Sequence, residues 1–190
     1  MEWLNDLKEK FSRRRIKSLD RTKEFSRDFV DIESARFIGV IVNVDALTPE
    51  DQTLAKEYLA ALKQKKKRTL VIEISFNKKS EPTWQSQGDE FIFINPNKLN
   101  WLEYPTPAIE SQIRQYELDI LIDLDVSLHM TSKYVCSMAK ARTRTGIHRE
   151  GLESCYELMI HRPEENDLKS LLKEFDYFLN MIDNGQRAHV

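Results

Sequence analysis

Glycine, cysteine and histidine are scarce in this chain, and each shortage excludes a class of function. Only 5 of the 190 residues are glycine and only 2 are cysteine. Cys136 and Cys155 have no CxxC pattern between them and no histidine pair at ligand spacing nearby, so we expect reduced thiols in the core rather than metal or redox chemistry. The 4 histidines are scattered at His129, His148, His161 and His189. No two of them share a helix face, so we expect no metal and no cofactor.

Long apolar runs are also missing. No stretch approaches the roughly 18 to 20 apolar residues that span a bilayer. The N-terminus, MEWLNDLKEKFSRRR, lacks the continuous apolar core of a signal peptide. With 32% charged and 41% hydrophobic residues, the composition is that of an ordinary soluble chain, and its length suits one domain. We therefore expect a cytoplasmic protein without a transmembrane segment.

Charge is distributed unevenly along the chain. Residues 1–27 carry a net charge of +4, so the remainder carries −6. Trp3, Leu4, Leu7 and Phe11 recur at helical spacing, which predicts a basic amphipathic helix within an N-terminal arm over residues 1–35. Its apolar stripe needs a partner, which is the domain itself, a second copy, another protein or a membrane surface. We expect the arm to contact a protein partner or to form a homodimer.

From Phe37 onward the sequence alternates between strand and helix patterns. Apolar, β-branched runs at residues 37–44 and 69–76 predict strands that are covered on both faces, and a shorter run at 91–94 predicts a third. Between the first two, Thr48 stands at a cap position, Pro49 at the first helical position and Asp51 where a capping-box acid belongs. These signals predict a helix that begins directly after Thr48.

The second half repeats the alternation. Helix patterns cover 108–117, 130–140 and the stretch after Pro163, and strand patterns cover 119–125, 141–147 and 155–162. Strands separated by helices pair in parallel through right-handed crossovers. The sequence therefore predicts an α/β fold: a three-layer α/β/α sandwich with a six-stranded, mostly parallel, Rossmann-like sheet of order 3-2-1-4-5-6. We assign residues 36–184 to this single domain and residues 185–190 to a disordered tail.

In such a sheet, ligands bind where the strand order reverses, here at the carboxyl ends of the first and fourth strands. The residues expected there are Asn43, Asp45, Ala46, Thr48, Asp125, Ser127 and His129. The stretch VNVDALTPED contains no glycine for a phosphate loop, and Glu50 and Asp51 occupy the first helical turn. We therefore expect no nucleotide phosphate at this edge. Specific nucleic-acid binding is not expected either, because the body is acidic and its strands carry no exposed aromatic platform.

The stretch ILIDLDVSL, residues 120–128, raises the alternative of a catalytic carboxylate pair. Asp123 and Asp125 are spaced as in the first motif of haloacid-dehalogenase phosphatases, but Val126 stands where glycine is usual and no adjacent acidic pair follows downstream. We therefore interpret Asp125 as a cap or loop acid. Asp123 lies inside the strand and needs a donor or a cation, for which we propose Arg142 or Arg144.

The segment KARTRTGIHRE offers a possible anion site. Arg142 and Arg144 share one face of the predicted strand, with His148 and Arg149 at its exit. Pairing of the arginines with acids of the same domain explains them equally well and is favoured over a bound anion. The acids available for this pairing are Asp119, Asp123 and Glu153.

Two resemblances complete the sequence analysis. Residues 116–148, with a strand ending in an acid, a helix, a small-residue turn and an R-x-G strand, resemble part of the heptosyltransferase-type glycosyltransferases. That resemblance implies that Asp45 would serve as a base for an acceptor sugar. Those enzymes hold their sugar nucleotide mainly in a second Rossmann-like domain, and this chain ends before one could begin.

Nearly the whole chain, from LKEKF through FIGVIVN, DILIDLD and ARTRTGIH to LLKEFDYFLNMI, is similar to a family of small uncharacterised bacterial cytosolic proteins. That resemblance implies the architecture and supplies no catalytic residue. The leading hypothesis is a non-catalytic binding or assembly module. The alternative is an enzyme or binder for a small sugar or phosphorylated metabolite at the crevice between the first and fourth strands.

Overall fold

The computed structural model describes residues 10–11, 13–16, 18–19, 28–85, 90–161 and 168–181. The predicted tail over 185–190 and most of the apolar stripe of the arm lie outside these ranges. Within the ranges that the structure describes, no helix is both long enough and apolar enough to cross a bilayer.

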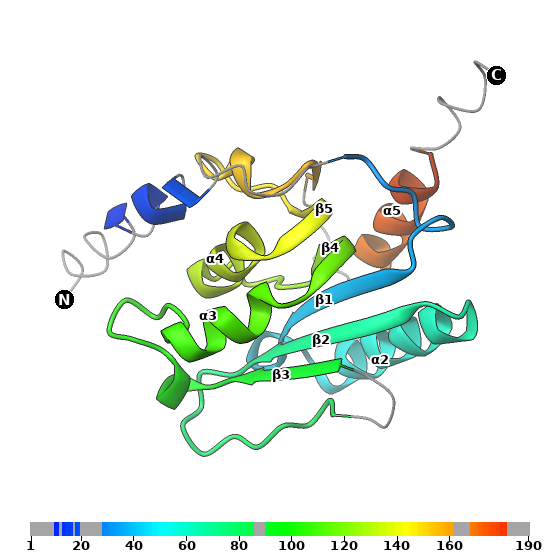
Figure 1. The fold of residues 1–190 in the computed structure, drawn as a ribbon. Coiled ribbons are helices and arrows are strands. Elements are labelled where there is room, and N and C mark those ends of the chain that lie inside the picture. The colour runs from blue at the N-terminus through cyan, green and yellow to red at the C-terminus, as the bar shows by residue number, and fades with distance from the viewer. Residues whose placement is uncertain are drawn as a thin grey trace.

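A six-stranded parallel sheet forms the centre of the molecule, and its order β3-β2-β1-β4-β5-β6 is the predicted one (Figure 1). Its strands are β1 (Phe37–Asn43), β2 (Arg68–Ile74), β3 (Glu90–Ile94), β4 (Glu117–Asp123), β5 (Lys140–Ile147) and β6 (Leu158–Ile160). All residues of β1 are buried, as its continuous apolar sequence predicts for a strand covered on both faces. The order reverses between β1 and β4, so the carboxyl ends of these two strands form the switch point.

Helices cover both faces of the sheet, which confirms the three layers (Figure 1). The helices α2 (Pro49–Gln64) and α5 (Leu168–Met181) enclose one apolar core, and α3 (Pro107–Arg114) and α4 (Met130–Met138) enclose the other. Three short 3-10 turns, η1 (Val44–Ala46), η2 (Pro96–Lys98) and η3 (Glu153–Cys155), lie in the connections.

The start of α2 shows how closely local sequence sets the structure. The Thr48 hydroxyl accepts a hydrogen bond from the backbone N–H of Asp51 at 3.1 Å, and the Asp51 carboxylate accepts one from the backbone N–H of Thr48 at 3.4 Å. Pro49 occupies the first helical position, where its missing N–H costs nothing. The predicted capping box is therefore confirmed.

The described part of the N-terminal arm lies against its own domain. Ile16 is fully buried in the core beneath α3 and α4. Arg13 donates from Nη1 to the backbone oxygen of Glu150 at 2.7 Å. Val30 and Ile32, which the prediction placed in the arm, are buried in the other core beneath α2 and α5. Residues 28–35 are thus part of the packed domain.

Candidate functional site

The site at the switch point is built around two carboxylates at the end of β4. Asp123, the last residue of this strand, is fully buried. Its Oδ2 accepts hydrogen bonds from Lys133 Nζ at 2.8 Å and from the Tyr156 hydroxyl at 2.5 Å, and its Oδ1 accepts one from the backbone N–H of Asp125 at 3.0 Å. The expectation that Arg142 or Arg144 pairs with Asp123 is therefore wrong.

Lys133 reaches Asp123 because α4 follows β4 directly and its first turn lies near the carboxyl end of that strand. Its side chain is also fully buried, and the ammonium lies 5.4 Å from the centroid of the Tyr156 ring. Burial and the negative charge of Asp123 hold the pKa of Tyr156 well above its usual value, so its hydroxyl stays protonated and donates. These three groups form a closed, dry unit beneath the site.

Asp125 organises the loop that follows β4. Its carboxylate accepts hydrogen bonds from the Asn43 amide, the Ser127 backbone and hydroxyl, the His129 backbone and the Ser132 hydroxyl, at 2.5 to 3.3 Å. Burial raises its pKa, but the charge of Lys133 and the hydrogen bonds of its neighbours outweigh this and lower the pKa below its ordinary value. Asp125 is therefore ionised, and of the two predicted roles, cap or loop acid, it has that of a loop acid, because His129 is the N-cap of α4.

The loop between Asp125 and α4 adopts an uncommon backbone conformation at Leu128, whose φ is +57°. The loop is held on both sides: the Leu128 N–H donates to the backbone oxygen of Asp125 at 3.2 Å, and its own carbonyl accepts a hydrogen bond from Arg149 Nη1. A left-handed leucine costs on the order of 1 kcal/mol, and the surrounding hydrogen bonds offset that cost. The loop is therefore fixed in shape.

Asn43 lies at the end of β1, at the switch point where the crevice was predicted. Its Nδ2 donates to Asp125 Oδ1 at 3.3 Å and to the Ser127 hydroxyl at 3.0 Å. The carboxylate of Asp125 only accepts, so the amide orientation of Asn43 is fixed. Its Oδ1 is buried and has no hydrogen-bond partner among the residues that the structure describes. The switch point thus holds a fixed, buried acceptor for which the described residues supply no donor.

Three segments surround the switch point: the turn η1 after β1, the residues after β2 and the loop before α4. Asp45 accepts hydrogen bonds from the Ser75 hydroxyl at 3.1 Å and from the backbone N–H of Phe76 at 2.5 Å. The ring of His129 packs against Phe76 with centroids 4.0 Å apart and the ring planes tilted by 40°, and its Nε2 lies 3.5 Å from Glu103. Burial lowers the pKa of His129 below its usual value, so the ring is neutral at pH 7.

The model of a protein family described as Family of unknown function (DUF6913) matches residues 8–182. The chain belongs to this family. No curated protein and no solved structure shows significant similarity to it. The resemblance to small uncharacterised proteins is thereby confirmed at the level of the family, and this DUF6913 protein has to be interpreted from its own geometry.

Four of the predicted crevice residues of the DUF6913 protein lie at the switch point. Asn43, Asp125 and Ser127 are joined by hydrogen bonds, and Asp45 lies on the rim. Thr48 lies near them but caps α2 through Asp51.

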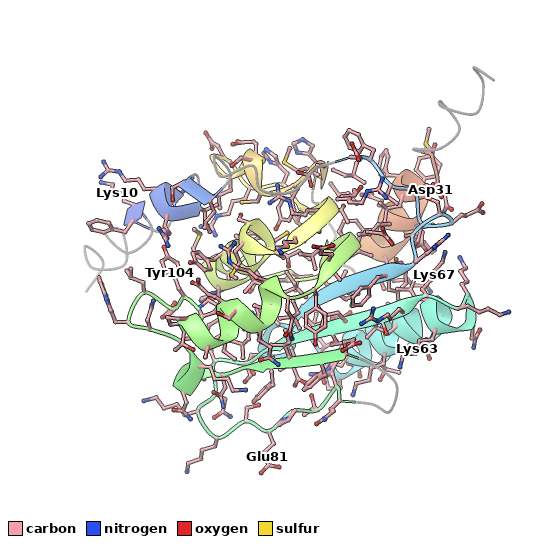
Figure 2. The ribbon with its side chains drawn as sticks, in the orientation of Figure 1. Lys10, Asp31, Lys63, Lys67, Glu81 and Tyr104 are labelled. Carbon is pink, nitrogen blue, oxygen red and sulfur yellow. The ribbon has the colours of Figure 1, made fainter. Side chains whose placement is uncertain are left out.

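The other three predicted residues lie elsewhere. Arg142 lies near the amino end of the sheet, where Nη1 is 3.7 Å from Asp119, an acid whose carboxylate accepts hydrogen bonds from the backbone at the start of β1. Figure 2 shows Asp31 and Lys67 at that same end and Tyr104 at the opposite one. Arg144 is buried and paired with Glu157 at 2.8 Å. His148, beyond β5, stacks on His161 with centroids 4.5 Å apart.

Sequence reasoning missed Lys133, Tyr156 and the Phe76–His129 stack. Cys136 and Cys155 are free thiols in the core, as expected, and burial raises the pKa of both. In the described part of the chain no group of three or more His, Cys, Asp or Glu side chains is placed to hold a metal ion.

Proposed function

We propose that this DUF6913 protein is a non-catalytic binding module that holds a small neutral polyol, such as a monosaccharide, at the switch-point crevice. The hydrogen bonding of Asp125 carries this proposal. Among the described residues, five groups donate to its carboxylate, and they come from Asn43, Ser127, His129 and Ser132. A carboxylate satisfied in this way is a scaffold for the loop.

Catalysis by the carboxylate pair would need a lone pair that can reach a substrate. A general base must lie within hydrogen-bond distance of the proton that it removes. Asp123 is fully buried and bound to Lys133 and Tyr156, and Asp125 is 1% exposed. Neither group has the access that a base or a nucleophile requires.

The ligand chemistry follows from Asn43 and the rim. The Oδ1 of Asn43 is buried and has no hydrogen-bond donor among the described residues, so a ligand hydroxyl that reaches this atom would satisfy it. The exposed carboxylate of Asp45 and the acidic first turn of α2 disfavour an anion at the same edge. Phe76, which is half-buried beside them, adds an apolar surface of the kind that lines small-molecule sites. A neutral, hydroxyl-rich molecule satisfies all three features.

The test is calorimetric titration with a panel of monosaccharides and their phosphate esters. We expect one or more neutral sugars to bind and the corresponding esters to bind more weakly. Asn43→Ala should abolish that binding, whereas Asn95→Ala, which removes a similar amide after β3, should leave it unchanged. Preference for the phosphorylated sugars, or equal binding by the Asn43→Ala variant, would refute the proposal.

An enzyme acting on a small sugar or phosphorylated compound is the second candidate, and Asp45 favours it. This residue is exposed at the same edge, and the resemblance to heptosyltransferase-type enzymes would make it the base. Its contacts with Ser75 and Phe76 restrict it, however, to a tie between the ends of β1 and β2. Turnover of a sugar or sugar nucleotide that is lost in Asp45→Asn and retained in Asp51→Asn would establish this alternative.

The predicted contact of the arm with a partner or second copy stays a prediction, because Trp3, Leu4 and Leu7 lie outside the described residues. The burial of Ile16 changes how it should be tested. Deleting residues 1–27 would open the core, whereas Trp3→Ala/Leu7→Ala leaves Ile16 in place. A lower mass by light scattering than that of the wild type would support contact with a second copy, and an equal mass would exclude it; loss of a protein captured by the wild type in pull-downs would support a partner, and an unchanged set of captured proteins would exclude one.

A further inference from the structure

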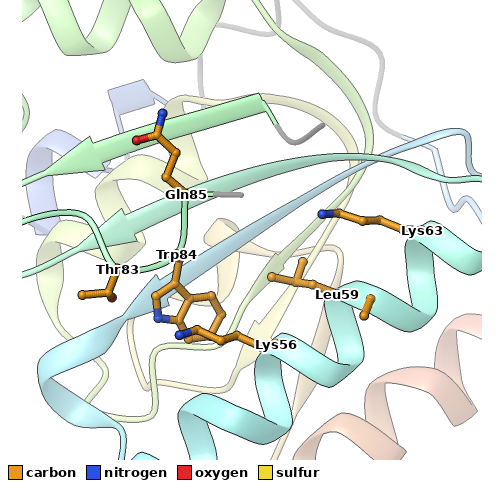
Figure 3. A pocket seen from close by; sticks show the side chains of 7 residues that line it. Lys56, Leu59, Lys63, Thr83, Trp84 and Gln85 are labelled. Carbon is orange, nitrogen blue, oxygen red and sulfur yellow. The ribbon is translucent and has the colours of Figure 1, made fainter. Parts of the chain in front are cut away.

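A groove lies between α2 and the loop that follows β2, away from the crevice (Figure 3). It has a volume of about 330 Å³ and is lined on one side by Lys56, Leu59, Ala60 and Lys63. These four residues fall at positions i, i+3, i+4 and i+7 and so share one face of the helix. The loop supplies the opposite wall, and its main contribution is the ring of Trp84.

A buried acid fixes the position of Trp84 through the backbone of its loop. Glu73 of β2 is fully buried, and its carboxylate accepts hydrogen bonds from the backbone N–H groups of Thr83 and Trp84 at 3.0 Å and from the Thr83 hydroxyl at 2.9 Å. The Glu73 carboxylate therefore faces the loop backbone and does not line the groove. The indole is thereby held in one place against α2.

The Trp84 indole N–H is a hydrogen-bond donor at the groove for which the described residues supply no acceptor. Trp84 is 4% exposed, and its indole N–H has no hydrogen-bond partner among the described residues. The Lys56 ammonium lies 5.3 Å from the centroid of the same ring. Figure 3 shows the indole nitrogen and the Lys56 amino group beside each other, with Lys63 toward the other end. Among the lining residues that the structure describes there is no carboxylate.

We propose that this groove is a second binding site, for a small organic carboxylate with an apolar or aromatic body. The carboxylate would accept hydrogen bonds from the Trp84 indole and from Lys56, whose exposed, flexible chain can turn toward it. Lys63 adds positive charge along the groove. The apolar body would lie between Leu59 and the indole, where it is removed from water. The site is independent of Asn43 and of the crevice ligand.

Benzoate is a suitable probe, and the indole signals provide the assay. The chain has 3 tryptophans, so a proton–nitrogen spectrum shows three indole signals, and Trp84→Phe identifies the one from Trp84. We expect benzoate to shift this signal saturably at concentrations up to about 10 mM, a range that suits a small fragment. Benzamide, which has the same shape without the charge, should shift it only weakly.

Lysine variants provide the control. Lys56→Gln should weaken benzoate binding about tenfold, the loss expected for one hydrogen bond to a charged group. Lys65→Gln makes the same charge change just beyond the end of α2, outside the groove, and should leave binding unchanged. An unshifted Trp84 signal, equal shifts with benzamide, or equal weakening by both lysine variants would overturn the proposal. Equal binding of inorganic phosphate would overturn the role of the apolar body.

Discussion

Replacing Lys133 by methionine tests the buried unit most directly. The side chains of Lys133 and Asp123 are both 0% exposed, so the substitution leaves a carboxylate in the core without its cation. Breaking a buried ion pair in this way typically costs about 3 to 5 kcal/mol. Asp123 retains two donors, the Tyr156 hydroxyl and the Asp125 backbone N–H, which places the expected loss near the lower limit, about 3 kcal/mol.

Urea unfolding followed by circular dichroism measures this loss. In thermal unfolding of a chain of this length, the same loss of about 3 kcal/mol corresponds to a fall in melting temperature of roughly 6 to 12 °C. Lys140→Met is the matched control, because Lys140 lies 3.9 Å from Glu117 in a solvent-exposed pair and should change stability by less than about 1 kcal/mol. The double variant Lys133→Met/Asp123→Asn removes both charges and should recover a substantial part of the loss.

The same substitution has a consequence at low pH. The charge of Lys133 helps to keep the pKa of Asp125 below its ordinary value. A carboxyl group with a lowered pKa stabilises the fold above its ordinary pKa and loses that contribution as the pH falls through the folded value. In Lys133→Met the Asp125 pKa rises, so acid unfolding should begin at a higher pH than in the wild type. If Lys133→Met differs from the wild type by less than about 1 kcal/mol in its free energy of unfolding and its acid transition is unchanged, Asp123, Lys133 and Tyr156 do not form a closed, buried unit.

Three further predictions concern local features. Thr48→Ala removes the side chain that caps α2 and should lower the free energy of unfolding by about 1 kcal/mol in urea titration. The pKa of His129, followed by proton NMR, should lie below its ordinary value of about 6.5, so stability should decrease as the pH falls below that value, and His129→Gln should remove this part of the pH dependence. Gly146→Ala would place a methyl group 2.5 Å from the ring of Tyr156, which cannot move without losing its bond to the buried acid, and should cost about 1 to 3 kcal/mol, whereas Gly39→Ala meets only flexible leucine methyl groups and should cost less.

Much of the fold could be predicted because its determinants are local. The capping box at Thr48 and Asp51 and the apolar run of β1 each depend on a few neighbouring residues. The meeting of Asn43 with Asp125 was also accessible, because parallel strands end at one edge and the strand order reverses between β1 and β4. Only the positions of elements were needed for that inference.

The groove could not be predicted because its parts come from unrelated segments. Trp84 lies in a stretch without periodicity, and nothing in the sequence near it indicates that Glu73 holds the loop against α2. Glu73 lies within the apolar run that predicts β2, and that run alone does not indicate a partner for it. One buried carboxylate and its hydrogen-bond donors fix the position of this loop, and such contacts between distant residues leave no local sequence pattern.

The ion pair of Asp123 and Lys133 was not predicted, although the sequence contains a signal for it. A carboxylate inside a buried strand requires a cation, and the prediction placed that cation on the neighbouring strand β5. In a strand–helix unit, however, the first turn of the helix lies close to the end of the strand before it. The helix α4 has the sequence MTSKYVCSM, in which Lys133 is the only charged residue. A lone lysine in an otherwise uncharged, buried helix directly after an acid-ending strand indicates an ion pair between them. The double variant described above tests that rule in this protein.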